Sequence, residues 1–490
     1  MPSTAAIGSP GSQNHELLRI GSARVDTAPR IEVRDPATGA VIGTCPSASA
    51  TEVTAAIGAA HTAFQTWGLT TASTRAGVLH AIAESMIADQ SALATLVTSE
   101  VGKPLAESRG EVAYAADFAQ WYAEETRRIH GRMTVGGTNE PWRQLMRQPV
   151  GVVGAITPWN YPLVLSARKI FAAIAAGCTV VLKPSELAPL AVFRLGMLAE
   201  RAGLPDGVLN IITADPPDVV GDTFSSDPRV RKISFTGSVK TGKNLMRIAA
   251  RTLTKIGLEL GGNNAFIVFE DADLDAAVEA AVVAKLRNGG QTCVCANRYL
   301  VHETVLEDFT ARFANVLGKK AVGSGFEPTT EVGPLINQRA VDRIQSTVDE
   351  ALAAGATVVC GGPEATTDGF PEGPFYPPTV LLRVDPDSRL MTEEIFGPVA
   401  PIIPFRDFSQ AIESANDTEY GLAAYVFTRS LKTAMRASEE LQTGIVVVNR
   451  PAPSGVEFPQ GGVKQSGIGL EGGPEGLEEF TTIKLVALGS

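Results

Sequence analysis

Strand-like and helix-like segments alternate regularly between residues 150 and 250, and this alternation constrains the fold more than any other feature of the chain. Strands are expected at 150–156, 179–182, 208–212 and 231–236. Helices are expected at 163–176, 189–202, 217–226 and 240–250. Repeats of this length predict an α/β fold with a doubly wound parallel sheet, whose ligands bind beyond the carboxyl ends of the strands.

The rest of the chain is arranged on both sides of this block. At 490 residues the protein exceeds one ordinary hydrophobic core, so two or three domains are expected. Residues 1–30 are interpreted as a loose N-terminal arm, and amphipathic helices are expected near 51–67, 72–98 and 105–129. Further expectations are a β-hairpin within 130–149, a second α/β block from 264 to 450 and a last strand at Thr482–Leu488.

Net charge and cysteine content argue against several classes of protein. A net charge of −11 disfavours nucleic acid or an anionic membrane as the main partner. The five cysteines are odd in number and widely spread, which favours a reduced, cytoplasmic protein over one built on disulfides. Prolines interrupt the longest uncharged run, between Arg147 and Arg168, so no membrane span is expected. The histidines are scattered, and no metal-ligand cluster is evident.

The segment Asn288–Arg298 contains two of the five cysteines, Cys293 and Cys295, directly after a Gly-Gly turn. A cysteine on a glycine-rich turn can be exposed to a ligand and approached closely by backbone amides, which are the conditions for a thiol nucleophile. The alternative is that both cysteines are small buried hydrophobic residues.

A glycine-rich segment, Gly237–Asn244, follows the expected strand 231–236 and nearly fits a nucleoside-triphosphate loop. Its last position is Asn244, so the hydroxyl that would hold Mg²⁺ is absent. What remains is a strand, a turn at Gly237 and Ser238, and a helix N-terminus, which would suit a dinucleotide pyrophosphate. The alternative is a plain turn into a helix.

Three polar residues, Lys183, Ser185 and Glu186, stand at the end of another expected strand. A carboxylate at the ligand edge of the sheet accepts hydrogen bonds from ribose hydroxyls and repels a 2′-phosphate, so Glu186 favours NAD over NADP. Lys183 and Ser185 would partly accommodate the phosphate, which keeps NADP open. The alternative is a charged pair at the surface.

Six motifs then occur in an order that resembles the aldehyde dehydrogenase superfamily, over nearly the whole chain from Asp35. They are Pro158-Trp159-Asn160, Lys183-Pro-Ser-Glu186, Phe235-Thr-Gly-Ser238, Glu259-Leu-Gly-Gly262, Gly290-Gln-Thr-Cys293 and Glu394-Ile-Phe-Gly-Pro398. Within the superfamily the chain most resembles the succinate-semialdehyde dehydrogenases. Segments such as Leu286-Arg-Asn288 and Cys293-Val-Cys-Ala-Asn-Arg298 carry that closer likeness.

The resemblance implies the domain division and the assembly. An NAD(P)-binding domain is expected at 1–130 and 150–260, and a catalytic domain at 261–460. A β-hairpin arm at 131–149 and 476–490 is expected to assemble a homodimer or homotetramer.

The resemblance also implies catalytic roles for four residues. Cys293 is the expected nucleophile, and its pKa is expected to be lowered so that thiolate is present near neutral pH. The Asn160 amide, with the Cys293 backbone N–H, is expected to hold the oxyanion. Glu259 is the expected general base that activates water, and Lys169 lies near the base and the cofactor.

Cofactor contacts follow from the same motifs, and no metal is implied. Glu394 is expected to orient the nicotinamide ribose, and Trp159 to wall the cofactor. The other residues expected to contact the cofactor are Ile156, Thr157, Pro158, Lys183, Ser185, Glu186, Gly237, Ser238, Leu260, Gly261 and Phe396.

The implied reaction is oxidation of an aldehyde to a free acid. A water-activating Glu259 disfavours the coenzyme A-acylating alternative, and the three catalytic residues together disfavour a non-catalytic structural role. Arg168, Arg287 and Ser454 match positions that hold a substrate carboxylate, which favours succinate semialdehyde. Departures at Arg450, Gln460 and Leu470 keep another semialdehyde, or an aromatic or aliphatic aldehyde, open.

Cys295 has two interpretations. It is either plain packing or the partner of Cys293 in a reversible disulfide that blocks catalysis under oxidation. Closing a bond across one intervening residue requires the loop to bend.

Overall fold

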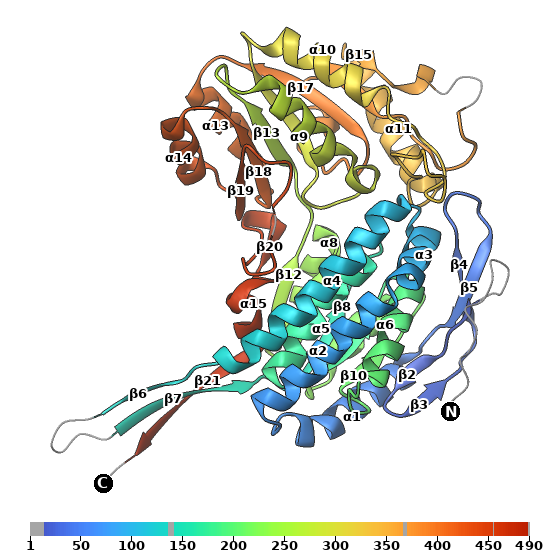
Figure 1. Cartoon of the computed structure of the whole chain (residues 1–490), viewed down its shortest axis with the longest axis vertical. Helices are drawn as coiled ribbons and strands as arrows, with labels where there is room; N and C mark the ends of the chain where they lie inside the picture. Colours follow the sequence, from blue (N-terminus) through green and yellow to red (C-terminus); the bar gives the residue numbers. More distant parts are fainter. Residues whose placement is uncertain (1–13, 136–141, 366–369, 454, 489–490) are drawn as a thin grey trace.

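The computed structural model describes residues 14–135, 142–365, 370–453 and 455–488. Ser454, expected at the substrate carboxylate, lies outside these residues. Two large sheets, each covered by helices, lie one above the other in Figure 1, and a narrow β-arm projects from the lower one. No helix among the described residues is long and apolar enough to cross a membrane.

The lower sheet has eight strands in the order β20-β12-β11-β8-β9-β10-β2-β3. Its five central strands are parallel: β12 (Lys255–Glu259), β11 (Val230–Thr236), β8 (Val152–Ile156), β9 (Thr179–Lys183) and β10 (Leu209–Ile211). The strand order reverses between β8 and β11, which is the point where ligands of such sheets bind. The expected doubly wound parallel sheet is therefore observed, with antiparallel strands added at both edges.

Helices cover both faces of this sheet. One face carries α2 (Ala72–Ala88), α3 (Gln90–Val101), α4 (Leu105–Glu125), α5 (Pro162–Ala176) and α6 (Leu190–Arg201). The other face carries α1 (Ala50–Trp67) and α7 (Asp218–Ser226), and α8 (Val239–Ala249) packs beside α7.

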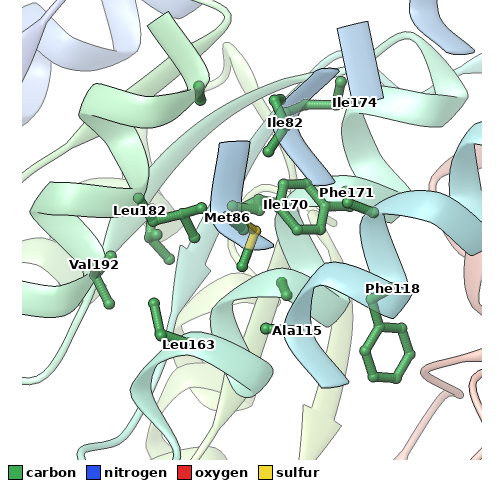
Figure 2. Close-up of a cluster of buried hydrophobic side chains, with 14 of the residues drawn as sticks. Ile82, Met86, Ala115, Phe118, Leu163, Ile170, Phe171, Ile174, Leu182 and Val192 are labelled. Carbon is green, nitrogen blue, oxygen red and sulfur yellow. The ribbon is translucent and has the colours of Figure 1, made fainter. Parts of the chain in front are cut away.

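Helix α5 is the centre of the largest hydrophobic core. Figure 2 shows its apolar side chains between those of α2, α4, α6 and β9, and the labelled residues are Ile82, Met86, Ala115, Phe118, Leu163, Ile170, Phe171, Ile174, Leu182 and Val192. Nearly every α5 residue is buried, because the helix is covered on the sheet side and on the α2–α4 side. This packing fixes the direction in which Arg168 and Lys169 leave the helix.

Two expectations for the N-terminal region are wrong. The loose arm expected over residues 1–30 is ordered from Asn14: β1 (Asn14–His15) pairs with β5 (Val41–Pro46), and β2 (Leu18–Ile20) and β3 (Ala23–Val25) extend the lower sheet. The helix expected at 72–98 is two helices separated at Asp89, whose backbone is not helical. The Asp89 carboxylate pairs with Arg194 of α6, an interaction that stabilises this turn.

The upper sheet has seven strands in the order β15-β16-β17-β14-β13-β18-β19. Six are parallel: β16 (Thr379–Leu382), β17 (Val399–Phe405), β14 (Ala296–His302), β13 (Asn264–Val268), β18 (Ala423–Phe427) and β19 (Ile445–Val448); β15 (Thr357–Cys360) is antiparallel. Its helices are α9 (Leu274–Leu286), α10 (Leu306–Leu317), α11 (Gln338–Ala353), the short α12 (Arg389–Thr392), α13 (Phe408–Asn416) and α14 (Leu431–Glu440).

The projecting arm is a three-stranded antiparallel sheet of β6 (Arg132–Thr134), β7 (Trp142–Pro149) and β21 (Thr481–Leu488). Before β21, the chain adds β20 (Gly467–Ile468) to the lower sheet and then forms α15 (Gly473–Glu478) against α5. Leu477 and Phe480 are buried in the α5 core, so residues 476–480 pack with the lower unit and the arm strand begins at Thr481. A smaller sheet joins β1, β5 and β4 (Arg30–Arg34).

Candidate active site

Four strand ends of the lower sheet lie side by side and form one edge of the candidate site. Ile156 of β8 is in register with Lys183 of β9, and Thr236 of β11 with Glu259 of β12. The Phe235–Ile156 pairing joins these two halves. Motifs that are far apart in the sequence therefore meet at the edge where a doubly wound sheet binds its ligand.

The turn at residues 287–292, called the nucleophile turn after the expected nucleophile Cys293, has an uncommon backbone. Asn288, Gly289 and Gly290 have φ values of 50°, 61° and 79°, all in the left-handed region. A Cβ at Gly290 would collide with the carbonyl oxygen of Gly397, so glycine is required there. The chain therefore reverses sharply after α9 and brings Cys293 to the space between the two sheets.

Side chains of the upper sheet fix the carbonyl groups that flank this thiol. The Asn264 amide donates to the carbonyl oxygens of Cys293 and Cys295, both at 2.8 Å. The Tyr425 hydroxyl donates to the carbonyl oxygen of Val294 at 2.7 Å. These bonds satisfy the carbonyl oxygens and leave the Cys293 backbone N–H without an acceptor among the described residues.

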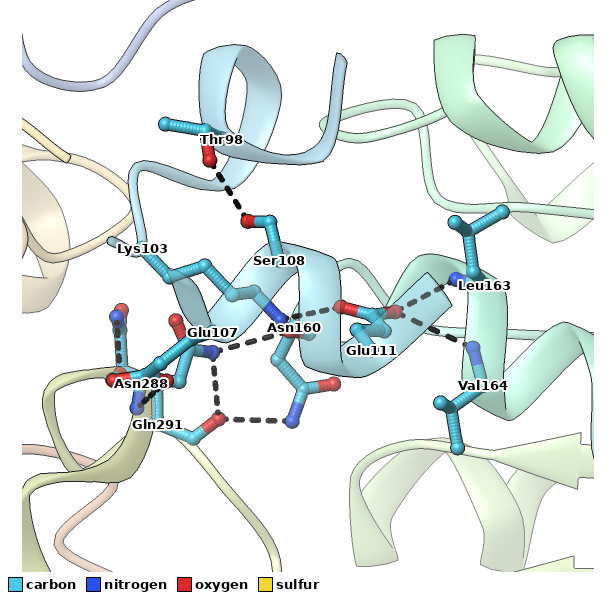
Figure 3. Close-up of polar contacts among 10 residues, drawn as sticks. All are labelled: Thr98, Lys103, Glu107, Ser108, Glu111, Asn160, Leu163, Val164, Asn288 and Gln291. Atoms are coloured by element: carbon cyan, nitrogen blue, oxygen red, sulfur yellow. Dashed lines mark hydrogen bonds and ion pairs between the residues drawn. The ribbon is translucent and has the colours of Figure 1, made fainter. Parts of the chain in front are cut away.

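Asn160 lies at the start of α5, within the network of Figure 3. Its amide nitrogen donates to the Gln291 carbonyl oxygen at 2.9 Å, and an amide carries a second N–H that this bond leaves unused. Its backbone carbonyl accepts from Lys103 at 2.8 Å and from Asn288 at 3.1 Å. Asn160 and the nucleophile turn are thus tied to each other directly.

Lys103 and Glu111 belong to this network, although the sequence motifs assign neither of them a role. Both side chains are buried, and the Lys103 ammonium lies 2.6 Å from Glu111. The second Glu111 oxygen accepts from the backbone N–H groups of Leu163 and Val164 at 2.9 and 3.3 Å, at the N-terminus of α5. The pair holds α4, α5 and the Asn160 carbonyl together (Figure 3).

The pKa of Cys293 differs from the expectation. Burial raises the pKa of the thiol to about 11, and the carboxylates of Glu394 and Glu259 add to the rise. Arg168 and Arg287 oppose it, but their effect is smaller than that of burial. The expected lowering is therefore not observed, because the thiol is surrounded by protein and by carboxyl groups.

Glu259 lies near a buried ion pair, whose charges act on it. Lys169 of α5 is paired with Glu471, and both side chains are almost fully buried. One Glu259 oxygen has no hydrogen-bond partner among the described residues. Burial raises the pKa of Glu259 well above its usual value, Glu471 adds to the rise and Lys169 opposes it. A carboxylate whose pKa is raised binds a proton more tightly than one in water, which suits a general base.

Glu394 is held against the Gly261-Gly262 turn. Its carboxylate accepts from the Gly262 N–H at 3.2 Å, and a Cβ at Gly261 would collide with it. Burial raises the pKa of Glu394 to about 7. Nearby, the Trp159 ring meets the ring of Phe396 edge to face, with centroids 5.7 Å apart. These residues bring the β12 end and the Glu394 loop onto the same side of Cys293.

The turn at Gly237 and Ser238, which is expected to bind a pyrophosphate, uses its polar groups in hydrogen bonds within the protein. The Gly237 N–H donates to the Glu259 carbonyl at 3.0 Å, and the Ser238 hydroxyl caps α8 by accepting from the Thr241 N–H. The helix N-terminus is present, but these two groups already have partners. The Thr236 hydroxyl, by contrast, is buried without a partner among the described residues.

The polar group at the end of β9 is an ion pair. Lys183 lies 2.8 Å from Glu186, and the Ser185 hydroxyl accepts from the Leu187 N–H at 3.3 Å. The Thr157 hydroxyl bonds to Ser166 at 3.2 Å, and Pro158 follows it toward Trp159. Leu260 is buried against α8 and β11.

A cavity of about 310 Å³ lies in front of Cys293, between α4, α5 and the nucleophile turn. Arg168 and Arg287 both line it, and neither forms an ion pair with a carboxylate among the described residues. Its wall also contains Glu107, Glu111, Tyr114, Tyr161, Val164, Leu165, Pro453 and Gln460. Two arginines from separate elements thus converge on one space with the thiol.

Cys295 points away from this cavity. It is buried, and its thiol lies 3.7 Å from the Lys285 carbonyl and 3.5 Å from the Ala296 carbonyl. Burial raises its pKa, and all five cysteines are free. The described residues contain no group of His, Cys, Asp and Glu side chains that could hold a metal ion.

Comparison with known proteins agrees with this geometry. The chain belongs to the aldehyde dehydrogenase family, whose model matches residues 24–486. It is 46% identical to a mitochondrial succinate-semialdehyde dehydrogenase of Arabidopsis thaliana, covering 94% of this chain and 86% of that protein. It is 44% identical to an NADP-linked succinate-semialdehyde dehydrogenase of Escherichia coli, over 94% of both chains. A glutarate-semialdehyde dehydrogenase of Pseudomonas putida is also 44% identical, over 94% of this chain and 95% of that protein.

Solved structures confirm the expected fold. Succinate-semialdehyde dehydrogenase from Burkholderia pseudomallei superposes with a TM-score of 0.94 at 43% identity, covering 97% of this chain and 98% of that chain. Betaine aldehyde dehydrogenase from Staphylococcus aureus, solved with NAD+, gives a TM-score of 0.93 at 37% identity, covering 96% and 94%.

We predict that the Cys293 thiol of the cofactor-free protein reacts slowly at neutral pH. Because its pKa is about 11, the thiolate fraction should rise about tenfold for each pH unit between roughly pH 7 and 9. The rate of iodoacetamide labelling of the Cys293 peptide, followed by mass spectrometry, measures this fraction. Glu394→Gln should label faster at the same pH, because it removes a carboxylate that raises the pKa. A rate that stops rising below about pH 8 would contradict the prediction.

Proposed function

We propose that the protein oxidises an aldehyde to the free carboxylic acid with NAD(P)+, through a covalent intermediate on Cys293. The observation that carries this proposal is the convergence of Cys293, Asn160 and Glu259 on one space at the carboxyl edge of the lower sheet. Relatives that are 44–46% identical and named for semialdehyde oxidation support it.

The residues at the sheet edge suit a dinucleotide. The switch point between β8 and β11 offers space for a ligand. The N-terminus of α8 and the Thr236 hydroxyl, which has no partner among the described residues, offer hydrogen-bond donors. Trp159, Phe396 and Glu394 would bound the nicotinamide end, and Lys183 with Glu186 the ribose end. We propose that NAD binds here. NADP also fits, because Lys183 leaves a cation beside Glu186.

Cys293 begins the reaction by adding its sulfur to the aldehyde carbon. The thiol proton must leave for this step, and solvent water takes it up, so that Glu259 stays free for the later hydrolysis. The resulting oxyanion of the thiohemiacetal would accept hydrogen bonds from the free N–H of Asn160 and from the Cys293 backbone N–H.

NAD(P)+ supplies the acceptor for the hydride that leaves the thiohemiacetal carbon, and a Cys293 thioester remains. Glu259 then removes a proton from water, which adds to the thioester carbonyl and displaces the Cys293 sulfur. One aldehyde, one water and one NAD(P)+ thus give one carboxylate, one NAD(P)H and two protons. The Lys169–Glu471 pair would hold Glu259 through its charge and would not touch the reacting atoms.

We predict that Glu259→Gln separates the two halves of the reaction. The variant should release a burst of about one NAD(P)H per active site and then turn over about 100-fold or more slowly, because water is no longer activated. Stopped-flow absorbance at the NAD(P)H band measures both phases. Cys293→Ala should show neither burst nor turnover while it still binds NAD. Unchanged steady-state turnover in Glu259→Gln would contradict the role of Glu259.

We further propose that the substrate carries a carboxylate at its far end, and that it is succinate semialdehyde. Arg168 and Arg287 enter the cavity from α5 and from the nucleophile turn without a carboxylate partner among the described residues. Tyr114 and Phe118 lie 5.9 and 5.1 Å from the Arg168 guanidinium carbon and restrict its position. Two such guanidinium groups match a short carboxylate, and Ser454 is proposed as a hydroxyl contact.

We predict that Arg287→Met lowers kcat/KM for succinate semialdehyde by about 100-fold or more, because a buried charge partner of the substrate is lost. Butanal has the same chain length without the carboxylate, and its kcat/KM should change less than about threefold. Initial rates with both aldehydes, and with glutarate semialdehyde and benzaldehyde in the wild type, test this. Wild-type efficiency that is equal for butanal and succinate semialdehyde would contradict the carboxylate clamp.

We also propose that the arm assembles a homodimer or homotetramer in the cytoplasm. Two side chains of β21 on the same face, Ile483 and Leu485, are 59% and 66% exposed. On the opposite face Trp142 and Leu488 are also about half exposed and lie opposite each other in register. Apolar residues in this quantity on a thin sheet favour burial against a second copy.

We predict that Leu485→Glu shifts the protein to a smaller species, because it places a charge on the apolar arm face. Light scattering after size-exclusion chromatography gives the mass. Leu69→Glu, at an 85% exposed position of a turn outside the arm, is the matched control and should leave the mass unchanged. An unchanged mass in Leu485→Glu would contradict assembly through this face.

A further inference from the structure

Tyr161 contributes to the wall of the Cys293 cavity and lies close to two cations. The Lys103 ammonium is 3.7 Å from the centre of its ring, and the Arg287 guanidinium carbon is 5.9 Å from it. The Lys103 contact holds one face of the ring, because a cation over an aromatic face is attracted to it. The side chain is therefore fixed by the same buried lysine that bonds to the Asn160 carbonyl.

The hydroxyl of Tyr161 is buried, its oxygen lies against the Arg287 guanidinium as an acceptor, and its proton has no acceptor among the described residues. Burial raises its pKa, so the phenol keeps its proton at working pH and remains a donor. The neighbouring cations, Arg287 and Lys103, have only donors to offer. The phenol proton therefore requires an acceptor that the surrounding side chains do not supply.

The two carboxylates of the cavity wall are already engaged. Glu111 is bound to Lys103 and to the amides at the start of α5. Glu107 accepts from the Asn288 backbone N–H at 2.8 Å, and burial raises its pKa. An incoming carboxylate held by Arg287 would bring an oxygen to the same part of the cavity, next to the Tyr161 hydroxyl.

We propose that the Tyr161 hydroxyl donates a hydrogen bond to the distal carboxylate of the substrate, beside Arg287. Tyr161 is then a specificity-determining residue, since its bond forms with an ω-carboxylated aldehyde and has no counterpart in an alkyl aldehyde. A buried polar group built to bind a substrate oxygen discriminates against an analogue that lacks it. This inference rests on the proposed oxidation of a carboxylated aldehyde.

Tyr161→Phe tests this, because it removes only the hydroxyl and keeps the ring that Lys103 contacts. We expect kcat/KM for succinate semialdehyde to fall about 10- to 100-fold, mainly through KM, as for a lost hydrogen bond to a charged group. Butanal kinetics and the KM for NAD should stay within about twofold of wild type, and inhibition by succinate should weaken by a factor similar to the KM change.

Tyr376→Phe is the matched control. Its hydroxyl is buried and has no partner among the described residues, and it lies in the core of the upper unit, away from the cavity. It should leave both substrates unaffected. Equal losses of Tyr161→Phe on succinate semialdehyde and butanal, or no loss on either, would overturn the role of Tyr161 while the preference of the wild type for the carboxylated substrate stands. Loss of that preference in the wild type itself would overturn the carboxylate clamp and this inference together.

Discussion

The buried ammonium of Lys103 is the contact on which the geometry of the site depends. It bonds to Glu111 of α4 and to the Asn160 carbonyl, and its charge also lies over the Tyr161 ring. Glu111 in turn fixes the N-terminus of α5. Removing one partner of a buried ion pair leaves an uncompensated charge, which typically costs about 3–5 kcal/mol. One interaction thus sets the positions of the helix that carries Arg168 and Lys169 and of the loop that carries Asn160.

The same network joins the two sheets. Asn160, from the lower unit, bonds through its amide to Gln291, and its carbonyl accepts from Asn288 of the nucleophile turn. Glu107 adds a bond to the Asn288 N–H. The groups that we propose as catalytic, which come from separate units, are therefore held at fixed separation, which is the kind of preorganisation that acyl-transfer chemistry needs.

Burial shifts the pKa values of the site's titratable groups in one direction. Burial raises the pKa values of Cys293, Glu259 and Glu394 together, and each carboxylate raises that of the thiol further. A neutral thiol is less readily oxidised than a thiolate, so the resting protein is chemically protected. Cys295, turned toward Lys285 and buried, contributes packing in this conformation. A disulfide with Cys293 would require the loop to rearrange.

Local sequence patterns predicted the regular parts of the lower unit well, since β8, β9, β11 and the helices between them follow from hydrophobic periodicity. The errors came from long-range pairing. Strand β2 is ordered because Arg19 pairs with Ile211, almost two hundred residues away in the sequence. The residues around Arg19 do not predict this pairing. The break at Asp89 depends on Arg194 of another helix. Glu471 had no motif to mark it, since only the fold brings it to Lys169.

The sequence by itself determined which chemical groups are available: a thiol on a glycine turn, a carboxyl before Gly261, an amide before α5 and two arginines at fixed offsets from them. Their residue types and their order along the chain were also sufficient to indicate the protein family. Only the tertiary structure decided their environment. Burial and the charge of nearby carboxylates raise the pKa of Cys293 instead of lowering it. The folded backbone places the Cys295 thiol near the Lys285 carbonyl. The side chains around Tyr161 leave its hydroxyl proton without an acceptor beside Arg287. These properties depend on which atoms surround a group in space, and the chain specifies that only after it has folded.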